Sequence, residues 1–164
     1  MDRASTLFEN HPEALYRYLV RLCGDTDLAA DAAQETFVRL LAAPATDTIE
    51  RAWLFAVATN YLLDRHRTSM RRGRLLGANG DRTLADPPRD PHAALEADER
   101  RRVVTTALSR LSEKERIAVL MREEGFTHRE IADAVGTTTG SVGTLLARTL
   151  ERLARDITLN ADAL

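Results

Sequence analysis

Apolar residues recur every three or four positions through most of this chain, which is the spacing of one face of an α-helix. The interval holds from Ser5 to Leu22, from Leu28 to Ala43 and from Arg51 to Arg67, and His11-Pro12 marks a break in the first stretch. No stretch alternates apolar and polar residues as a half-buried strand does. The sequence therefore predicts an all-α fold.

The helical pattern stops in the middle of the chain, where glycine, proline and aspartate become frequent. Such a composition is typical of a flexible connection between domains. We expect an N-terminal helical domain over residues 1–75, a flexible linker over 76–91 and a C-terminal helical domain over 92–158. Each domain is near the lower size limit for an independent hydrophobic core.

The C-terminal domain ends in two helices joined by a tight turn, over residues 127–153. Thr127 and Glu130 have the spacing of a capping box, and Gly136 stands where the first helix would end. Thr138 can cap the longer second helix. The pattern predicts a helix-turn-helix, whose second helix lies in the DNA major groove in DNA-binding examples. A plain helical hairpin would show the same pattern.

The composition adds local detail to this picture. The chain is 44% hydrophobic and 29% charged, as a soluble globular protein is. Its net charge of −2 argues against a general nucleic-acid coat but permits local basic patches. The densest patch runs from Arg65 to Arg74, with five arginines and no acid. It is either a solvated helix end or a surface for DNA phosphates.

Several classes of protein are disfavoured by what the sequence lacks. It has no glycine-rich phosphate loop, no cluster of metal ligands and no Ser/His/Asp arrangement. The N-terminus is unlike a signal peptide, and no apolar run is long enough to insert into a membrane. The single cysteine, Cys23, lies in an apolar run, so we expect it to be buried. We expect a cytoplasmic protein that is not an enzyme and binds no cofactor or metal.

Two helical domains joined by a linker, the second ending in a helix-turn-helix, resemble the extracytoplasmic-function sigma factors of bacterial RNA polymerase. Asp31–Leu41 is similar to region 2.2 of that family, and Arg51–Arg67 is similar to regions 2.3 and 2.4. Ala107–Leu153 is similar to region 4. The three motifs occur in the family's order and extend over nearly the whole chain.

This resemblance implies a function in transcription initiation. Sigma factors of this kind bind core RNA polymerase and direct it to promoter DNA. The first domain reads and melts the minus-ten element, and the second reads the minus-thirty-five element. An anti-sigma factor is the usual regulatory partner. Two alternatives are a sigma-like interaction protein that binds polymerase or an anti-sigma factor but reads DNA weakly, and an ordinary two-domain transcriptional regulator.

The resemblance assigns roles to residues of the first domain. Asp31, Gln34 and Glu35 would face the arginine-rich clamp helices of the polymerase, although an acidic helix face is often simply solvated. Phe37 would belong to the core.

Asn60 would contact an unpaired promoter base, with a structural asparagine as the alternative. The loop 44–50 would hold that flipped base. Trp53 would stack on single-stranded DNA or join the core. The DNA backbone would be bound by Arg65, Arg67 and Arg71.

In the second domain, the resemblance assigns minus-thirty-five contacts to Thr138, Thr139, Ser141, Thr144 and Arg148. The match departs from the family here, because Gly143, Thr144 and Leu145 replace the usual basic-Ser-Arg run. Two cations are therefore absent from the expected DNA face. Ala56 and Thr59 similarly stand where the family often has arginine.

Overall fold

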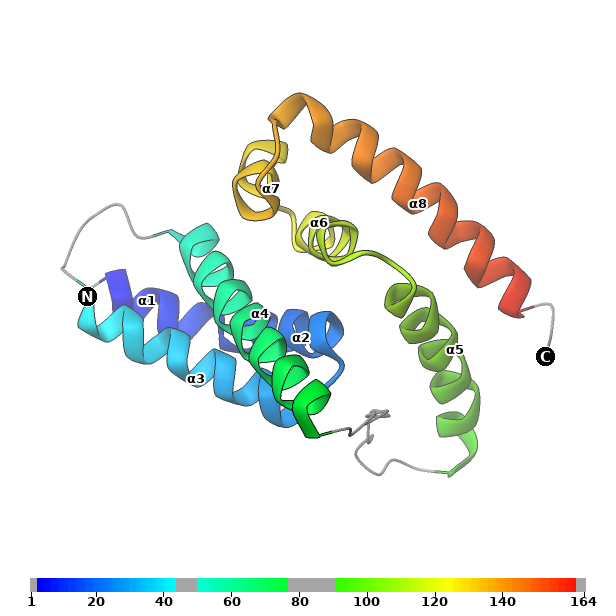
Figure 1. The fold of residues 1–164 in the computed structure, drawn as a ribbon, viewed down its shortest axis with the longest axis horizontal. Helices are drawn as coiled ribbons and strands as arrows, with labels where there is room; N and C mark the ends of the chain where they lie inside the picture. The colour runs from blue at the N-terminus through cyan, green and yellow to red at the C-terminus, as the bar shows by residue number, and fades with distance from the viewer. Residues whose placement is uncertain (1–2, 44–49, 77–90, 162–164) are drawn as a thin grey trace. The chain divides into compact units, whose positions relative to one another are not determined.

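The computed structural model describes residues 3–43, 50–76 and 91–161. All regular secondary structure in these ranges is helical, which confirms the predicted all-α class. The chain divides into two compact units, Met1–Ala85 and Asp86–Leu164 (Figure 1). The linker predicted at 76–91 lies outside the described residues except for its first and last positions, so the predicted domain limits stay a prediction.

Local signals in the sequence explain where the helices of the first unit begin and end. Pro12 occupies the first turn of a helix, where its missing N–H is not needed, and the predicted break at His11-Pro12 is confirmed. Gly24 ends that helix with a φ of 71°. The Asp25 carboxylate caps the next helix by accepting hydrogen bonds from the N–H groups of Asp27 and Leu28, each at 3.0 Å. The helices are α1 (Arg3–Asn10), α2 (Pro12–Cys23), α3 (Thr26–Ala42) and α4 (Arg51–Leu76).

The core of the first unit lies where α2, α3 and α4 pack together. Its fully buried side chains include the ring of Phe55, 5.0 Å from the ring of Tyr18. Thr59 is also buried and donates a hydrogen bond to the Phe55 carbonyl at 2.6 Å. The Tyr18 hydroxyl lies 2.9 Å from the Thr59 hydroxyl, so both polar groups are satisfied inside the core. Phe37 is buried, as predicted.

Two neighbouring leucines of α3 differ in burial. Leu40 is buried, but 75% of the surface of Leu41 is exposed, because a shift of one residue turns a side chain by about 100° around a helix. Cys23, which was expected to be buried, is only half-buried, and its thiol donates a hydrogen bond to the Asp25 carbonyl at 3.2 Å.

The second unit is the predicted set of four helices. Ser112 with Glu115, and Thr127 with Glu130, form the two capping boxes. Gly136 ends the first helix of the predicted helix-turn-helix with a φ of 69°. The last helix continues beyond the predicted domain limit, to Ala161. The helices are α5 (Pro91–Ser109), α6 (Glu113–Glu123), α7 (His128–Val135) and α8 (Thr139–Ala161).

The buried face of α8 includes a threonine. Leu150 is 48% exposed, whereas the neighbouring Thr149 is buried in line with Val142, Leu146 and Leu153. A threonine is acceptable there because its hydroxyl donates to the Leu145 carbonyl at 2.7 Å, so no buried donor is left unpaired.

Candidate functional site

The acidic residues predicted to face the polymerase lie along one side of α3. Asp31 and Gln34 are exposed, and Glu35 is partly exposed. Glu35 is already engaged within the helix, because its Oε1 accepts a hydrogen bond from Arg39 Nε at 2.8 Å. The last acidic residue of this face, Glu35, is therefore paired with Arg39, which lies one helical turn later in α3.

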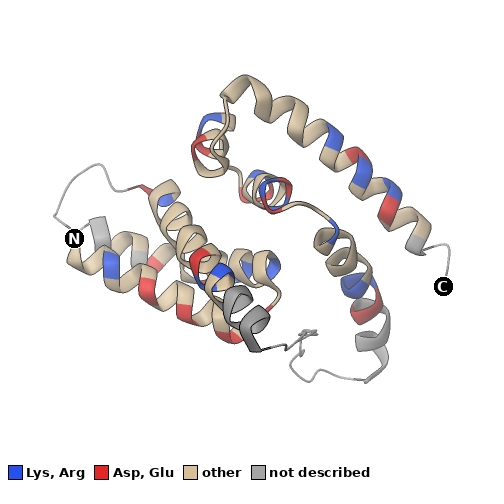
Figure 2. Cartoon of the chain, in the orientation of Figure 1, with Lys and Arg blue, Asp and Glu red and all other residues tan. Residues whose placement is uncertain are grey.

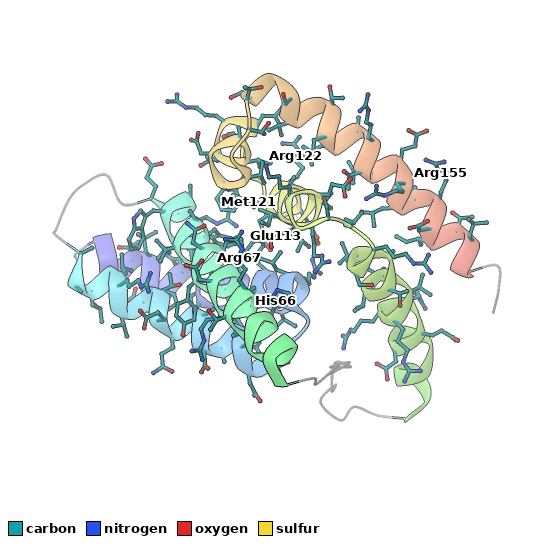
Figure 3. All side chains as sticks on the ribbon, in the orientation of Figure 1. His66, Arg67, Glu113, Met121, Arg122 and Arg155 are labelled. Atoms are coloured by element: carbon teal, nitrogen blue, oxygen red, sulfur yellow. The ribbon has the colours of Figure 1, made fainter. Side chains whose placement is uncertain are left out.

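Asn60 is exposed in the middle of α4. It is therefore neither buried nor a helix cap, and its predicted contact with an unpaired base stays a prediction. Arg65 and Arg67 are exposed on the next turns of the same helix, and Figure 3 labels Arg67 on α4. Arg67 Nη1 lies 3.9 Å from Asp64 Oδ1, a loose ion pair between two exposed side chains. An amide and several cations are thus presented to solvent along one helix.

For other residues of the first unit, the structure does not decide between the predicted roles. Trp53 is half-buried at the start of α4, between the two alternatives given for it. Arg71 belongs to α4, but its side chain lies outside the described residues, as does the loop 44–49. Thr59 is buried against Tyr18. Position 59 is therefore not part of the exposed face of α4, and the lack of an arginine there does not reduce the charge of that face.

One aromatic residue between α3 and α4 gained no role from the sequence. The ring of half-buried Tyr61 has two guanidinium groups near it. Arg39 Cζ lies 5.6 Å from the ring centroid and Arg65 Cζ lies 6.0 Å from it. The i, i+4 spacing of Tyr61 and Arg65 is visible in the sequence, whereas the contact with Arg39 depends on how α3 packs on α4.

All residues predicted to read the minus-thirty-five element are exposed: Thr138, Thr139, Ser141, Thr144 and Arg148. Hydroxyl groups cap the first turn of α8, because Thr138 Oγ1 accepts from the Ser141 N–H at 3.3 Å and lies 2.8 Å from Ser141 Oγ. No charged residue occurs from 134 to 147, and the first half of α8 is uniformly uncharged in Figure 2. This end of α8 can offer hydrogen bonds and close approach, but little charge.

Packing does not require glycine at position 143. A Cβ added to Gly143 would meet only one atom within 4 Å, the His128 Cε1 at 3.9 Å, which is an ordinary van der Waals distance. Gly143 also does not have a positive φ. The backbone at this position therefore accepts a Cβ, and the fold does not demand glycine there.

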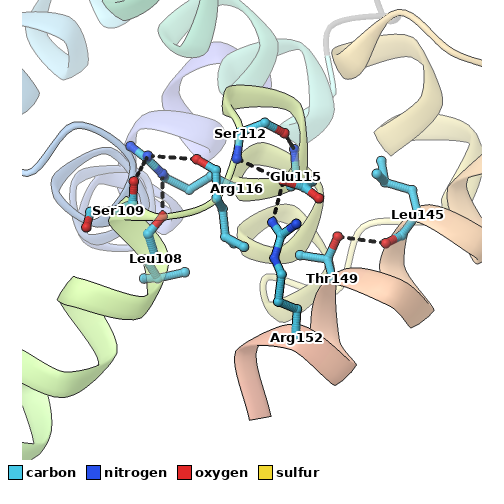
Figure 4. A network of polar contacts seen from close by, with 9 residues as sticks. Leu108, Ser109, Ser112, Glu115, Arg116, Leu145, Thr149 and Arg152 are labelled. Atoms are coloured by element: carbon cyan, nitrogen blue, oxygen red, sulfur yellow. Dashed lines mark hydrogen bonds and ion pairs between the residues drawn. The ribbon is translucent and has the colours of Figure 1, made fainter. Parts of the chain in front are cut away.

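The other half of α8 is anchored by a polar network (Figure 4). Arg152 Nη2 donates to Glu115 Oε2 at 2.7 Å, and the Ser112 N–H donates to the same oxygen at 2.8 Å. The neighbouring Arg116 donates to the Leu108 carbonyl at the end of α5, at 3.0 Å. Two adjacent residues of α6 thus hold both α5 and α8.

The network also changes the acidity of Glu115. Burial by itself raises the pKa of the Glu115 carboxyl, but hydrogen bonds from Arg152 and Ser112, with the charge of Arg152, lower it below its ordinary value. Glu115 is therefore held as a carboxylate, the form that pairs with Arg152.

The described residues give no sign of a metal centre or a membrane segment. No three His, Cys, Asp or Glu side chains among them are grouped so as to hold a metal ion. None of their helices combines the length and hydrophobicity needed to cross a membrane.

Comparisons with known proteins agree with this arrangement. Residues 7–72 match the family described as Sigma-70 region 2, and residues 101–153 match Sigma-70, region 4. Over 144 residues the chain is 34% identical to the ECF RNA polymerase sigma factor SigL of Mycobacterium tuberculosis, covering 83% of this chain and 78% of that protein. The chain belongs to the extracytoplasmic-function sigma factors.

Further similar proteins support the same assignment. The ECF sigma factor SigE of Mycolicibacterium smegmatis is 31% identical over 155 residues, which cover 90% of this chain and 58% of SigE. A solved structure of the sigma factor RpoE with the anti-sigma factor NepR from Bartonella quintana has the same fold. It matches with a TM-score of 0.76 at 21% identity, covering 94% of this chain and 95% of RpoE.

Membership of this family confirms the predicted fold class and general function. This sigma factor binds core RNA polymerase and directs it to promoter DNA for transcription initiation. Sigma factors are regulators of transcription and not enzymes. Neither alternative reading of the sequence is better supported.

Proposed function

We propose that this sigma factor opens promoters through the exposed side of α4, with Asn60 reading an unpaired base of the minus-ten element. The exposure of Asn60 in the middle of α4, within the match to sigma region 2, is the observation that carries the proposal. An amide can both donate to and accept from the Watson–Crick edge of a flipped base. Arg65, Arg67 and Arg71, on the following turns of the helix, bind the backbone phosphates, and Trp53 is the candidate for stacking on the single strand.

Polymerase is bound by Asp31, Gln34 and Glu35 of α3. Two of these side chains are exposed and the third is partly exposed, so they are available to a basic partner. This role suits the arginine-rich clamp helices that the family resemblance implies. We also propose that an anti-sigma factor covers these surfaces when the factor is inactive, since RpoE is known in a complex with one.

The minus-thirty-five element is read by the first half of α8, through Thr138, Thr139, Ser141, Thr144 and Arg148. Their shared exposure supports this role. Because the surface is almost uncharged, we propose that it contributes sequence preference more than affinity. Phosphate neutralisation supplies much of the affinity of DNA-binding proteins, and direct base contacts supply the specificity.

The remaining expectations belong to the same proposal. The factor works in the cytoplasm, without a cofactor or metal and without catalysis of its own, as the polymerase carries out RNA synthesis. The N-terminal helical domain ends near residue 75, and the C-terminal one begins near residue 92 after a flexible linker.

The Asn60→Ala substitution tests the central assignment. Promoter opening by the reconstituted holoenzyme, followed as exposure of minus-ten bases to a chemical probe, should fall roughly tenfold because a base contact of ~1–3 kcal/mol is lost. Core binding should stay within about twofold of the unsubstituted protein. Asn10→Ala is the matched control, because Asn10 is exposed on α1. Equal losses of core binding and opening would show that Asn60 is structural.

A further inference from the structure

The contact between Tyr61 and two arginines joins the surfaces proposed for polymerase and for DNA. Arg39 comes from α3, which carries the acidic polymerase face, and Arg65 comes from α4, which carries the DNA face. Both guanidinium groups lie near one ring, with their Cζ atoms 5.6 and 6.0 Å from its centroid. Two cations are therefore within roughly 12 Å of each other, the sum of these distances. Both can therefore lie along one stretch of a DNA strand, whose charges repeat every ~3.4 Å of helix axis.

We propose that Arg39 is a further contact to the promoter backbone, presented beside Arg65 by the Tyr61 ring and masked by Glu35 until polymerase binds. This inference rests on the proposed function, which gives Arg65 to DNA and Glu35 to polymerase. The proposed DNA-binding surface would then include Arg39 of α3 as well as the residues of α4.

The Tyr61 ring is suited to a positioning role. It is half-buried between packed helices, whereas both arginine side chains are exposed. The ring is therefore the more buried member of the group, and the exposed guanidinium groups lie against it. Stacking on an aromatic face orders an arginine before its ligand arrives, which reduces the entropy lost when a phosphate binds.

Arg39 retains the donors needed for a phosphate. Its only hydrogen bond within the described part of the chain uses Nε, which donates to Glu35 Oε1. Its two terminal nitrogens donate to no described residue. A phosphate can therefore bind at the open edge of the guanidinium group, as arginine often binds anions.

The ion pair with Glu35 limits how well Arg39 can bind a phosphate before polymerase is bound. At 2.8 Å the Glu35 carboxylate forms an exposed i, i+4 ion pair with Arg39, which partly offsets the charge of the arginine in the free protein. A polymerase cation that pairs with Glu35 weakens this ion pair and releases the charge of Arg39 toward DNA. Binding of polymerase and binding of DNA then favour each other, and the coupling is reciprocal.

The test counts phosphates in the assembled holoenzyme. Binding to a promoter fork is measured by fluorescence anisotropy over a salt series, for Arg39→Gln, Arg39→Lys, Arg65→Gln and the control Arg17→Gln. Arg17 is exposed on α2 with no ion pair among the described residues. Arg39→Gln should flatten the slope of log affinity against log salt by about 0.7–0.9, the value for one phosphate. Arg39→Lys should keep most of the slope, and Arg17→Gln should keep all of it.

The contradicting outcomes are distinct. If Arg65→Gln flattens the slope and Arg39→Gln behaves like the control, the inference is wrong and the proposed DNA face stands. If neither changes the slope, the proposed DNA face itself fails. If Arg39→Gln weakens assembly with core polymerase and leaves the slope intact, Arg39 belongs to the polymerase interface instead.

Two further comparisons test the positioning and the masking. Tyr61→Leu should weaken fork binding about two- to fivefold, while Tyr61→Phe, which keeps the ring, should have no effect. In the free chain, Glu35→Gln should raise affinity for the fork about twofold, but only when Arg39 is present. A loss shared by both Tyr61 variants contradicts the positioning role. An unchanged free-chain affinity, or a rise that persists with Arg39→Gln, contradicts the masking role.

Discussion

The two helices proposed to contact DNA, α4 and α8, differ in the charge of their exposed residues. The exposed side of α4 presents Asn60 among cations, some of them paired with nearby carboxylates or aromatic rings. The first half of α8 presents hydroxyl groups and glycines, with no charge between residues 134 and 147. Its other half is anchored to α6 by the ion pair of Arg152 and Glu115. Helix α4 can therefore supply DNA affinity through its charge. Helix α8 has little charge to offer, so its contribution depends on the accurate position that its contacts with α6 give it.

The largest expected effect is on the charged side of this comparison. Replacing both Arg65 and Arg67 by glutamine should lower promoter affinity of the holoenzyme roughly 10- to 100-fold at low salt, because two phosphate contacts are lost. Replacing both Thr139 and Thr144 by valine should change the salt slope little and reduce discrimination against a scrambled minus-thirty-five element. Anisotropy titrations over a salt series on both templates measure both quantities. Similar slopes for the two double variants would break the comparison.

The anchoring of α8 gives the next effect. Glu115→Ala removes a capping box and an ion pair together, so it should lower the free energy of unfolding by roughly 1–2 kcal/mol. Arg152→Met removes only the half-exposed ion pair and should cost less than about 1 kcal/mol. The matched controls are Glu151→Ala and Arg155→Met, which change exposed α8 residues without an ion pair among those described. Urea unfolding measures all four. Losses as large in the controls would show that the network does not anchor α8.

The same network predicts a pH dependence. The pKa of Glu115 is lowered in the folded protein, so its stabilising contribution is fully present above the unfolded value of about 4.3. It is lost as the pH falls through the folded value. The stability difference between the unsubstituted protein and Glu115→Gln should therefore shrink as the pH is lowered from 7 to below 4. A difference that stays constant over this range would contradict the role given to the carboxylate.

A smaller effect is expected from restoring charge to α8. Gly143→Arg should raise affinity for promoters with a minus-thirty-five element about three- to tenfold and steepen the salt slope by about 0.9. The first atom of the new side chain has room, because the added Cβ would meet only His128 Cε1, at 3.9 Å. It should also stabilise α8 by up to about 1 kcal/mol, as glycine is a poor helix former. Ala154→Arg, on an exposed position of the same helix, is the control. No gain over that control would remove position 143 from the DNA face.

Much of the fold could be predicted because its signals are local. Capping residues lie three positions apart, as in Thr127 and Glu130, and Pro12 marks a helix start by its own chemistry. Periodicity identified the helices but not their exact rotation. Leu41 and Leu150 lie at helical spacing with buried residues but are exposed, because spacing alone does not show where the buried stripe ends. The burial of Thr149 could not be predicted, because a threonine is polar by composition. Its hydroxyl is satisfied by the Leu145 carbonyl, and only the structure shows that hydrogen bond.

The candidate sites divide in the same way. Asn60 and the arginines of α4 were identified from the family motif, which is continuous in the sequence. Glu115 and Arg152 are 37 residues apart, and Arg39 meets Tyr61 across two helices. No spacing rule connects such pairs, since the packing of the helices decides which side chains meet. These long-range contacts required the structure.

Mapping of transcription start sites with the reconstituted holoenzyme on a genomic promoter library tests the central claim most directly. The holoenzyme should produce start sites that are absent with core polymerase alone. A shared minus-ten element should precede them at a fixed distance, with a weaker shared preference at minus thirty-five. Tight binding to core without any such start sites would contradict it.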